Sequence, residues 1–282
     1  CGQSPYYGTP SAIPGTIQAE NFDLGGEGVA YHDTTSGNSG SQYRTLENVD
    51  IQNCTDTGGG YNIGWTATGE WMEYTVNVGI AGTYTIEARV AANAAIGIFH
   101  IEFNGVDKTG NINVPVTGGW QNWTTVSATV TLSAGTQVMR FVSSTNDFNI
   151  NYFNISANMV TVPDVNGLSQ ASAQSAITAA GLTVGVRSQS FSNTVADGNV
   201  ISQTPGGGTS APAGSPVDLV ISLGIRGDLN VDGTVDIDDV YIMAVEWLSS
   251  GVLADIEPVG GNGVVDFLDF AVLASNWGQS IY

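Results

Sequence analysis

The 282-residue sequence is poor in basic side chains, with six Lys and Arg against 26 Asp and Glu and a formal net charge of −20. Phosphate groups are bound by clustered cations, so nucleic acids and anionic membrane surfaces are poor candidate partners. No apolar run approaches the roughly 18 residues that a membrane-spanning helix needs. Two cysteines are too few to define a disulfide framework. Cys1 and Cys54 could pair in an oxidising compartment, or Cys1 could be the end of a fragment.

Catalytic motifs are lacking as well. The two histidines, His32 and His100, are far apart, and no Gly-x-Ser-x-Gly, His-Glu-x-x-His or phosphate-binding loop occurs. A glycosidase needs two carboxylates across a cleft. Glu73, Glu87 and Glu102 fall on different predicted strands, where exposed acids are ordinary, although the sequence alone does not exclude a pairing. We therefore expect that this region is not an enzyme and that any glycoside hydrolase domain lies upstream.

Gly, Ser, Thr and Asn are abundant and charged residues make up only 11%, a mix typical of secreted, β-rich bacterial proteins. The length suits two or three domains. Composition divides the chain into residues 1–158, 159–224 and 225–282, and the short connectors predict domains in series with limited freedom. Because the chain starts at Cys1 rather than Met, we expect it to be an excised C-terminal piece of a longer secreted protein.

The first zone, residues 1–158, predicts an all-β domain. Apolar and polar residues alternate along several runs, so each strand has one buried and one solvent-exposed face. The predicted buried sets are Met72, Tyr74, Val76 and Val78; Tyr84, Ile86, Ala88 and Val90; Phe99, Ile101 and Phe103; and Val126, Ala128, Val130 and Leu132. Turn signals separate the runs. Many antiparallel strands in this length predict a β-sandwich of the jelly-roll type.

Four segments of this zone resemble the family 6 carbohydrate-binding modules. They occur in the family's order and cover nearly the whole zone: Pro14–Phe22 (PGTIQAENF), Gly69–Tyr74 (GEWMEY), Gly118–Trp123 (GGWQNW) and Phe148–Tyr152 (FNINY). The resemblance implies a jelly roll with a sugar-binding cleft in the loops at one edge of the sandwich. In that cleft two aromatic rings clamp one sugar ring, and an asparagine and a glutamate bind its hydroxyl groups.

By position in these motifs, the resemblance implies that Tyr43 and Trp120 are the aromatic pair. It also implies that Asn149 is the amide and Glu27 the carboxylate. The chemistry agrees, because the apolar C–H face of a pyranose stacks on an aromatic ring and an amide can both donate to and accept from its hydroxyl groups. Trp120 follows two glycines outside the strand alternation, which favours a loop tip over a core position. Trp65 is interpreted as a packing residue.

The family also has a structural calcium ion near its first strand. Gln18 and Glu20 match its side-chain ligands, and Asn151 is a further candidate. Family members usually have a second acid where Gln18 stands, so this sequence departs from the family pattern at that ligand. Calcium at this position is therefore an expectation that rests on the resemblance.

The second zone, residues 159–224, resembles a PASTA domain. The matching segments are Val162–Leu168 (VPDVNGL), Ala179–Leu182 (AAGL), Val200–Pro205 (VISQTP) and Gly214–Ser222 (GSPVDLVIS). A helix is predicted from Ser169, its N-cap, to Ala180, with Gly181 as the stop, packed on a small sheet. PASTA domains are known in cell-wall-sensing proteins. This copy has few charges and no aromatic patch for a ligand, so we interpret it as a rigid spacer.

The third zone opens with residues 228–239 (DLNVDGTVDIDD), which have the oxygen-ligand spacing of an EF-hand calcium loop. Position 6, where the backbone must turn sharply, is Gly233. Position 12 is an Asp where Glu is usual. The predicted ligands are side chains at positions 1, 3, 5, 9 and 12 and the carbonyl at position 7, which are Asp228, Asn230, Asp232, Asp236, Asp239 and Thr234.

The pattern returns thirty residues later, because Gly263–Trp277 repeats Gly233–Trp247. The second loop carries three extra residues, and its candidate ligands are Asp255, Glu257, Asn262, Asp266 and Asp269. Two loop-then-helix units with no entering helix resemble a dockerin, which implies a small, duplicated all-α domain that binds a cohesin partner. The alternative is a calcium-stapled domain with no partner.

The dockerin resemblance places docking side chains at loop positions 10 and 11. These are Ile237 and Asp238 in the first repeat, and Phe267 and Leu268 in the second. An exposed Phe and Leu side by side suggest a surface that a partner covers. The rival interpretation is that Phe267, Leu268, Phe270 and Leu273 form the core between the two helices.

Together these patterns predict a multidomain chain: mainly a β jelly-roll sandwich, then a small α+β PASTA-like domain, then a dockerin-like domain. We expect a secreted, extracellular or cell-surface region that binds a polysaccharide of the xylan, β-glucan or agarose class and uses calcium to dock to a cohesin-like protein. The alternative is a structural or adhesive surface protein that uses the same modules without an associated hydrolase.

Overall fold

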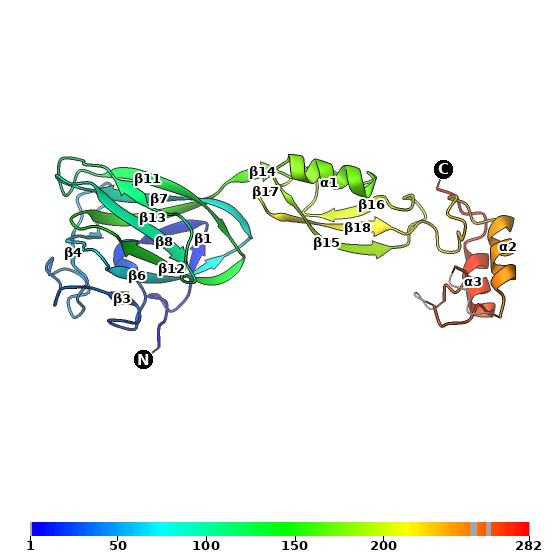
Figure 1. Cartoon of the computed structure of the whole chain (residues 1–282), viewed down its shortest axis with the longest axis horizontal. Helices are drawn as coiled ribbons and strands as arrows, with labels where there is room; N and C mark the ends of the chain where they lie inside the picture. The colour runs from blue at the N-terminus through cyan, green and yellow to red at the C-terminus, as the bar shows by residue number, and fades with distance from the viewer. Residues whose placement is uncertain (1, 249–252, 258–260, 282) are drawn as a thin grey trace. The chain divides into compact units, whose positions relative to one another are not determined.

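The computed structural model describes residues 2–248, 253–257 and 261–281 (Figure 1). The chain forms two compact units. The first ends at Met159 and also includes Pro212–Ser215, and the second comprises Val160–Ala211 and the chain from Pro216 onward. The predicted end of the first domain at residue 158 lies next to this division, whereas the predicted division after residue 224 falls within the second unit.

The first unit contains two β-sheets. One has the order β1 (Ser11–Ile13), β6 (Trp71–Val78), β12 (Gly135–Ser143), β8 (Gly97–Phe103) and β10 (Ile112–Val114), with β3 (Tyr31–His32) on β6 and β9 (Val106–Asp107) on β8. The other has the order β11 (Thr124–Leu132), β7 (Gly82–Ala91), β13 (Asn149–Ala157), β5 (Tyr61–Ile63) and β4 (Ile51–Asn53), with β2 (Gly15–Gln18) on β13. A 3₁₀ turn, η1 (Ala19–Asn21), follows β2.

Aromatic side chains from both sheets meet in one core, which confirms the predicted β-sandwich. Tyr74 of β6 contacts Phe153 of β13, with 5.8 Å between ring centroids, and Phe141 of β12 contacts the same ring at 6.1 Å. The predicted alternation is confirmed in β6, β7 and β8, whose predicted core residues are all buried. In β11 only Val130 and Leu132 are buried, because this strand lies at the edge of its sheet.

The PASTA-like part of the second unit contains one helix and two small sheets. Helix α1 (Gln170–Ala179) is capped by Ser169, as predicted, and it buries Ala173 and Ile177. One sheet has the order β15 (Thr183–Ser190), β18 (Pro216–Ser222) and β16 (Val200–Thr204), and β14 (Met159–Thr161) pairs with β17 (Ser210–Pro212). The buried side chains of helix and sheet form one core cluster.

The C-terminal part contains two short helices, each preceded by a loop. Helices α2 (Ile237–Glu246) and α3 (Phe267–Ser275) start with the same capping box, in which Asp236 and Asp266 are the N-caps. The buried apolar core is small, as expected for such a short segment: Ile225, Leu229, Val235, Met243, Ala254, Val265 and Leu273. The predicted second-loop insertion includes residues 258–260, which lie outside the described residues.

Phe267 and Leu268 are not core residues. They are 77% and 57% exposed, whereas Leu273, one and a half turns further along α3, is fully buried. Of the four residues in the rival interpretation, Leu273 is therefore in the core, whereas Phe267 and Leu268 are not and Phe270 is 41% exposed.

Two smaller expectations concern the termini and the membrane. Cys1 lies outside the described residues, so its pairing with Cys54 stays a prediction. Cys54 is buried, and burial raises the pKa of its thiol.

Among the helices of the described ranges, none is long and apolar enough to span a bilayer.

Candidate functional site

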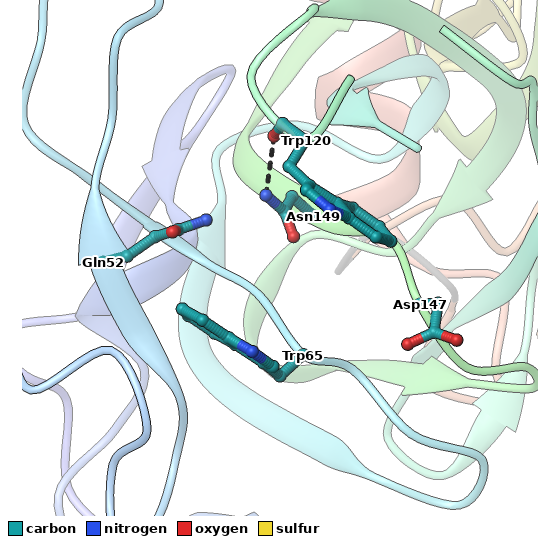
Figure 2. A pocket seen from close by; sticks show the side chains of 5 residues that line it. All are labelled: Gln52, Trp65, Trp120, Asp147 and Asn149. Atoms are coloured by element: carbon teal, nitrogen blue, oxygen red, sulfur yellow. Dashed lines mark hydrogen bonds between the residues drawn. The ribbon is translucent and has the colours of Figure 1, made fainter. Parts of the chain in front are cut away.

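One pocket of the first unit is lined by two tryptophans, two amides and one acid. Its volume is about 150 Å³, and its lining residues are Gln52, Trp65, Trp120, Asp147 and Asn149. The indoles of Trp65 and Trp120 lie on opposite sides of the gap, with Gln52 towards one end and Asp147 at the other (Figure 2). Trp65 is 49% and Trp120 43% exposed, so a flat ring can reach the space between them.

The loop that carries Trp65 is held in place by side-chain hydrogen bonds. Trp65 follows β5 and has a φ of 50°, a left-handed conformation that costs a bulky residue about 1–3 kcal/mol. The Thr66 hydroxyl donates to the Phe148 carbonyl at 2.8 Å and accepts from the Phe148 N–H at 3.1 Å. The Thr66 carbonyl accepts from the Asp147 N–H at 2.8 Å. These bonds fasten Trp65 to the segment that enters β13.

Trp120 is fixed from two sides. The side-chain amide of Asn149, at the start of β13, donates to the Trp120 carbonyl at 2.7 Å (Figure 2). The next residue, Gln121, accepts from the Thr55 N–H at 2.9 Å and donates to the Asn62 side-chain oxygen at 3.0 Å. The Trp120 turn is therefore tied to β13, to β5 and to the loop after β4.

Gly64 lies beside the polar groups of the pocket. A Cβ atom at this position would lie 2.9 Å from Asn149 Oδ1 and 3.2 Å from Gln52 Nε2. Only glycine, which has no Cβ, allows the backbone to come this close to the Asn149 and Gln52 side chains. The Asn149 oxygen and the Gln52 amide therefore face the same small space, where they can accept from and donate to a hydroxylated ligand.

The structure brings Trp120 and Asn149 together, but it does not place Tyr43 with them. The Tyr43 ring stacks on Tyr61, with 4.8 Å between centroids and 24° between planes. Its hydroxyl donates to Asn21 Oδ1 at 2.9 Å and shares a 2.7 Å hydrogen bond with the Tyr6 hydroxyl. Burial, together with the bond to Tyr6, raises the pKa of Tyr43. Tyr43 is not among the residues that line the pocket, where Trp65 faces Trp120, so the pairing of Tyr43 with Trp120 stays a prediction.

Glu27 likewise lies outside the pocket lining. One of its carboxylate oxygens lies 2.5 Å from His32 Nδ1, and the other accepts from the Asp33 N–H at 3.1 Å. These bonds fasten the turn before β3, so the predicted role of Glu27 as the sugar-binding carboxylate is not supported by its position. The acid that does line the pocket is Asp147.

Sequence reasoning missed Trp65, Gln52 and Asp147. A signal for Trp65 was present, since it directly follows a glycine and stands outside the strand alternation, as Trp120 does. No comparable signal marks Gln52, which sits on a three-residue strand, or Asp147, which sits in a polar loop. Their role depends on contacts between distant segments.

The predicted calcium ligands of the first unit fit a cation only in part. Glu20 is buried in η1, its Oε2 has no hydrogen-bond partner, and burial raises the pKa of its carboxyl to about 7. A cation beside it would satisfy this orphaned oxygen. Gln18 is exposed, and the Asn151 amide donates to Asp56 at 3.1 Å. Within the described ranges, no group of three or more His, Cys, Asp or Glu side chains gathers as a metal site.

The first C-terminal loop is organised around two aspartates. Asp239 is fully buried and accepts from the N–H groups of Leu229 at 2.6 Å and Asp236 at 2.8 Å. Asp228 accepts from Gly233 at 2.8 Å. Burial raises the pKa of Asp228, and the carboxylate of Asp239 adds to the rise. The remaining predicted ligands, Asn230, Asp232 and Thr234, lie between them, and Asn230 donates to the Asp232 carboxylate at 2.9 Å.

The second loop repeats this arrangement despite its insertion. Asp269 is buried and accepts from Ile256 at 2.6 Å and Asp266 at 2.8 Å. Desolvation opposes ionisation of Asp269, but these backbone bonds outweigh it and lower its pKa. Asp255 accepts from Asn262 at 2.8 Å. Glu257, by contrast, is paired with Arg226. The all-oxygen donor set of both loops suits a hard cation such as calcium.

Comparison with known families agrees with the first two domains. Residues 39–157 match the carbohydrate binding module (family 6), and residues 160–223 match the PASTA domain. Both matches end before the C-terminal loops.

Among curated proteins, the chain is 35% identical over 130 residues to the clotting factor G alpha subunit of Tachypleus tridentatus. The matched segment covers 45% of this chain and 19% of that protein. It is 44% identical over 64 residues to a probable serine/threonine-protein kinase of Clostridium acetobutylicum, covering 23% of this chain and 10% of that one. The chain thus spans about a fifth or less of the curated relatives' length.

Among solved structures, it is similar to a carbohydrate binding module from Cellvibrio mixtus lichenase 5A in complex with cellotriose. The identity is 34%, the coverage 51% of this chain and 97% of that one, and the TM-score 0.40. It is also similar to a β-1,3-glucan-binding family 6 module from Bacillus halodurans. The identity is 29%, the match covers 53% of this chain and 100% of that one, and the TM-score is 0.41.

Proposed function

We propose that this region binds a polysaccharide through the pocket between Trp65 and Trp120. The premise is that residues 39–157 belong to family 6 of the carbohydrate-binding modules and residues 160–223 to the PASTA domains. The observation that carries the proposal is the pair of exposed indoles on opposite sides of one small pocket, with two side-chain amides beside them. Stacking on the rings and hydrogen bonds to the amides are the two interactions that a pyranose offers.

The ligand class follows from the pocket and from the relatives. Its volume of about 150 Å³ suits one sugar ring rather than a large ligand. The module that is 34% identical was solved with cellotriose, and the one that is 29% identical is described as binding β-1,3-glucan. We favour a β-glucan, with xylan and agarose as the other candidates.

Binding without hydrolysis is the activity that we propose for this region. A glycosidase places two carboxyl groups about 5–10 Å apart across the bond that it cleaves. Among the residues that line the described pocket, Asp147 is the single acid, and Glu27 is occupied by His32 and Asp33 elsewhere. A catalytic domain, if the whole protein has one, would lie outside this chain.

Affinity electrophoresis tests the binding proposal. The full chain should be retarded in gels that contain laminarin, xylan or agarose-derived oligosaccharide, and Trp120→Ala should remove the retardation. Trp71→Ala is the matched control, because Trp71 lies on β6 beneath Arg140, outside the pocket lining. Retardation of Trp120→Ala equal to that of the unmodified chain would contradict the proposal.

For the C-terminal loops we propose calcium binding. Residues 225–282 carry ten acids and one arginine, and five aspartates with Asn230 crowd the first loop. Asp228, Asp232 and Asp239 would hold the ion, with the Thr234 carbonyl; Asp255, Asn262 and Asp269 would do so in the second loop. The bound cation would neutralise these charges, and a core of this size has little else to offset their repulsion.

We also propose that the C-terminal part docks to a protein partner of the cohesin type. Support comes from the apolar surface between its helices: a groove of about 370 Å³ that is lined by Val240, Met243, Ala244, Trp247, Phe267 and Phe270. Phe267 meets Trp247 edge to face at 5.2 Å while most of its ring stays exposed. Exposed apolar patches of this kind mark interaction sites. With the PASTA domain as spacer, the region would link an extracellular polysaccharide to a scaffold in a secreted or cell-surface protein.

A further inference from the structure

Among the described residues that line the pocket between the two indoles, Asp147 is the one ionisable side chain, and none of them is cationic. Its carboxylate is exposed at the end of the gap opposite Gln52 (Figure 2). Within the described part of the chain, no hydrogen bond or ion pair engages this carboxylate. A ligand ring between Trp65 and Trp120 would therefore face an uncompensated negative charge.

The position of this charge is fixed by the loop. Asp147 has a φ of 65°, and its N–H donates to the Thr66 carbonyl at 2.8 Å. The preceding residue, Asn146, accepts from the Thr68 N–H at 2.8 Å and from its hydroxyl at 3.0 Å. These contacts use the backbone of Asp147 and the side chain of Asn146, and not the Asp147 carboxylate. Asn or Gly adopts a left-handed φ at least as readily, so the backbone gives no reason for an acid here.

We propose that Asp147 makes this pocket selective for uncharged glycans over anionic ones; the inference rests on the proposed sugar-binding function. Neutral hydroxyl groups can donate charge-assisted hydrogen bonds to the carboxylate. A uronate, sulfate or carboxymethyl group would be repelled, and the indole walls exclude part of the water that would screen the repulsion. Because Asp147 is exposed, we expect discrimination of about five- to tenfold at low salt, which fades as salt rises.

A matched pair of ligands tests this inference on the full chain. Laminarin and carboxymethylated laminarin share one backbone and differ in charge, and their affinities are compared by isothermal titration at about 10 mM and 0.5 M NaCl. Asp147→Asn removes the charge and keeps the shape. Asp107→Asn is the control: it changes the net charge equally but lies on β9, where the side chain only accepts from the Thr109 and Gly110 N–H groups.

The expected result is that the unmodified chain and Asp107→Asn prefer the neutral polymer about five- to tenfold at low salt, and that Asp147→Asn brings the ratio to about one. Added salt should lower the ratio of the affinities for neutral and carboxymethylated laminarin only in the two proteins that keep Asp147. Equal affinity of the unmodified chain for both polymers, or a ratio that survives in Asp147→Asn, would overturn the inference while leaving sugar binding intact. Failure of the unmodified chain to bind any neutral glycan tested would instead overturn the proposed function.

Discussion

Replacement of Gly64 by Ala should block the polar side of the pocket and release one of the bonds that fix the Trp120 turn. Gly64 does not have a left-handed φ, so the backbone accepts alanine, and the effect is steric. The new methyl group would lie 2.9 Å from Asn149 Oδ1, closer than real Cβ contacts allow, and 3.2 Å from Gln52 Nε2. Asn149 must then move, and its 2.7 Å bond to the Trp120 carbonyl is lost.

The size of the effect follows from the hydrogen bonds at stake. A sugar would lose one or two bonds to these amides, each worth about 1 kcal/mol, so affinity should fall about 5- to 30-fold. Overpacking should cost the fold about 1–3 kcal/mol. Isothermal titration with laminarin or xylan measures the first effect and thermal denaturation the second. Gly206→Ala is the control, because a Cβ there meets nothing within 4 Å. A folded Gly64→Ala chain with unchanged affinity would refute this account of the pocket.

Three further predictions concern other parts of the chain. Removal of calcium with EDTA should lower the helix content and melting temperature of the C-terminal part, as measured by circular dichroism, because its aspartates then repel one another; an unchanged spectrum would count against calcium binding. Burial raises the pKa of Glu20 to about 7, so in EDTA the folded state binds more protons than the unfolded state between about pH 4.5 and 7 and stability should fall by up to about 3 kcal/mol as pH rises through that range. Glu20→Gln should flatten this slope, and a slope that persists would assign it to other groups. Replacement of Phe267 and Leu268 by polar residues should abolish capture of a cohesin-like protein from the secretome while calcium-dependent melting is kept, because both side chains are exposed; retained capture would place the docking surface elsewhere.

The strand pattern could be read from the sequence because it is a local property. Period-two runs such as Tyr84 to Val90 specify which residues are buried whatever their partner strands are. Trp120 was predicted from its position in the family motif, and its two preceding glycines favoured a loop tip over a core position. The contacts of Tyr43 could not be read in this way, because its surroundings are set by Tyr61 and Tyr6, which are distant in sequence.

The pocket itself could be read only in part. Trp65 is placed in the pocket by its left-handed backbone conformation and by the hydrogen bonds of Thr66 to Phe148, just before β13. Neither feature produces a periodic pattern in the sequence. Gln52 and Asp147 enter from separate loops and strands, so their convergence needs the folded chain. Sequence motifs thus predicted two of the five residues that line the pocket, Trp120 and Asn149, and long-range packing brings in the other three.

The central claim is that the sugar ring is held between Trp65 and Trp120. The most direct test compares Trp65→Ala with Tyr43→Ala in the full chain, by isothermal titration with the glycan that the unmodified chain binds best. Loss of one stacking face, worth about 1–2 kcal/mol or more, should weaken binding by Trp65→Ala at least about fivefold. Tyr43→Ala, which removes a ring outside the pocket lining, should stay within about threefold of the unmodified chain. Binding that is lost in Tyr43→Ala and kept in Trp65→Ala would contradict the account.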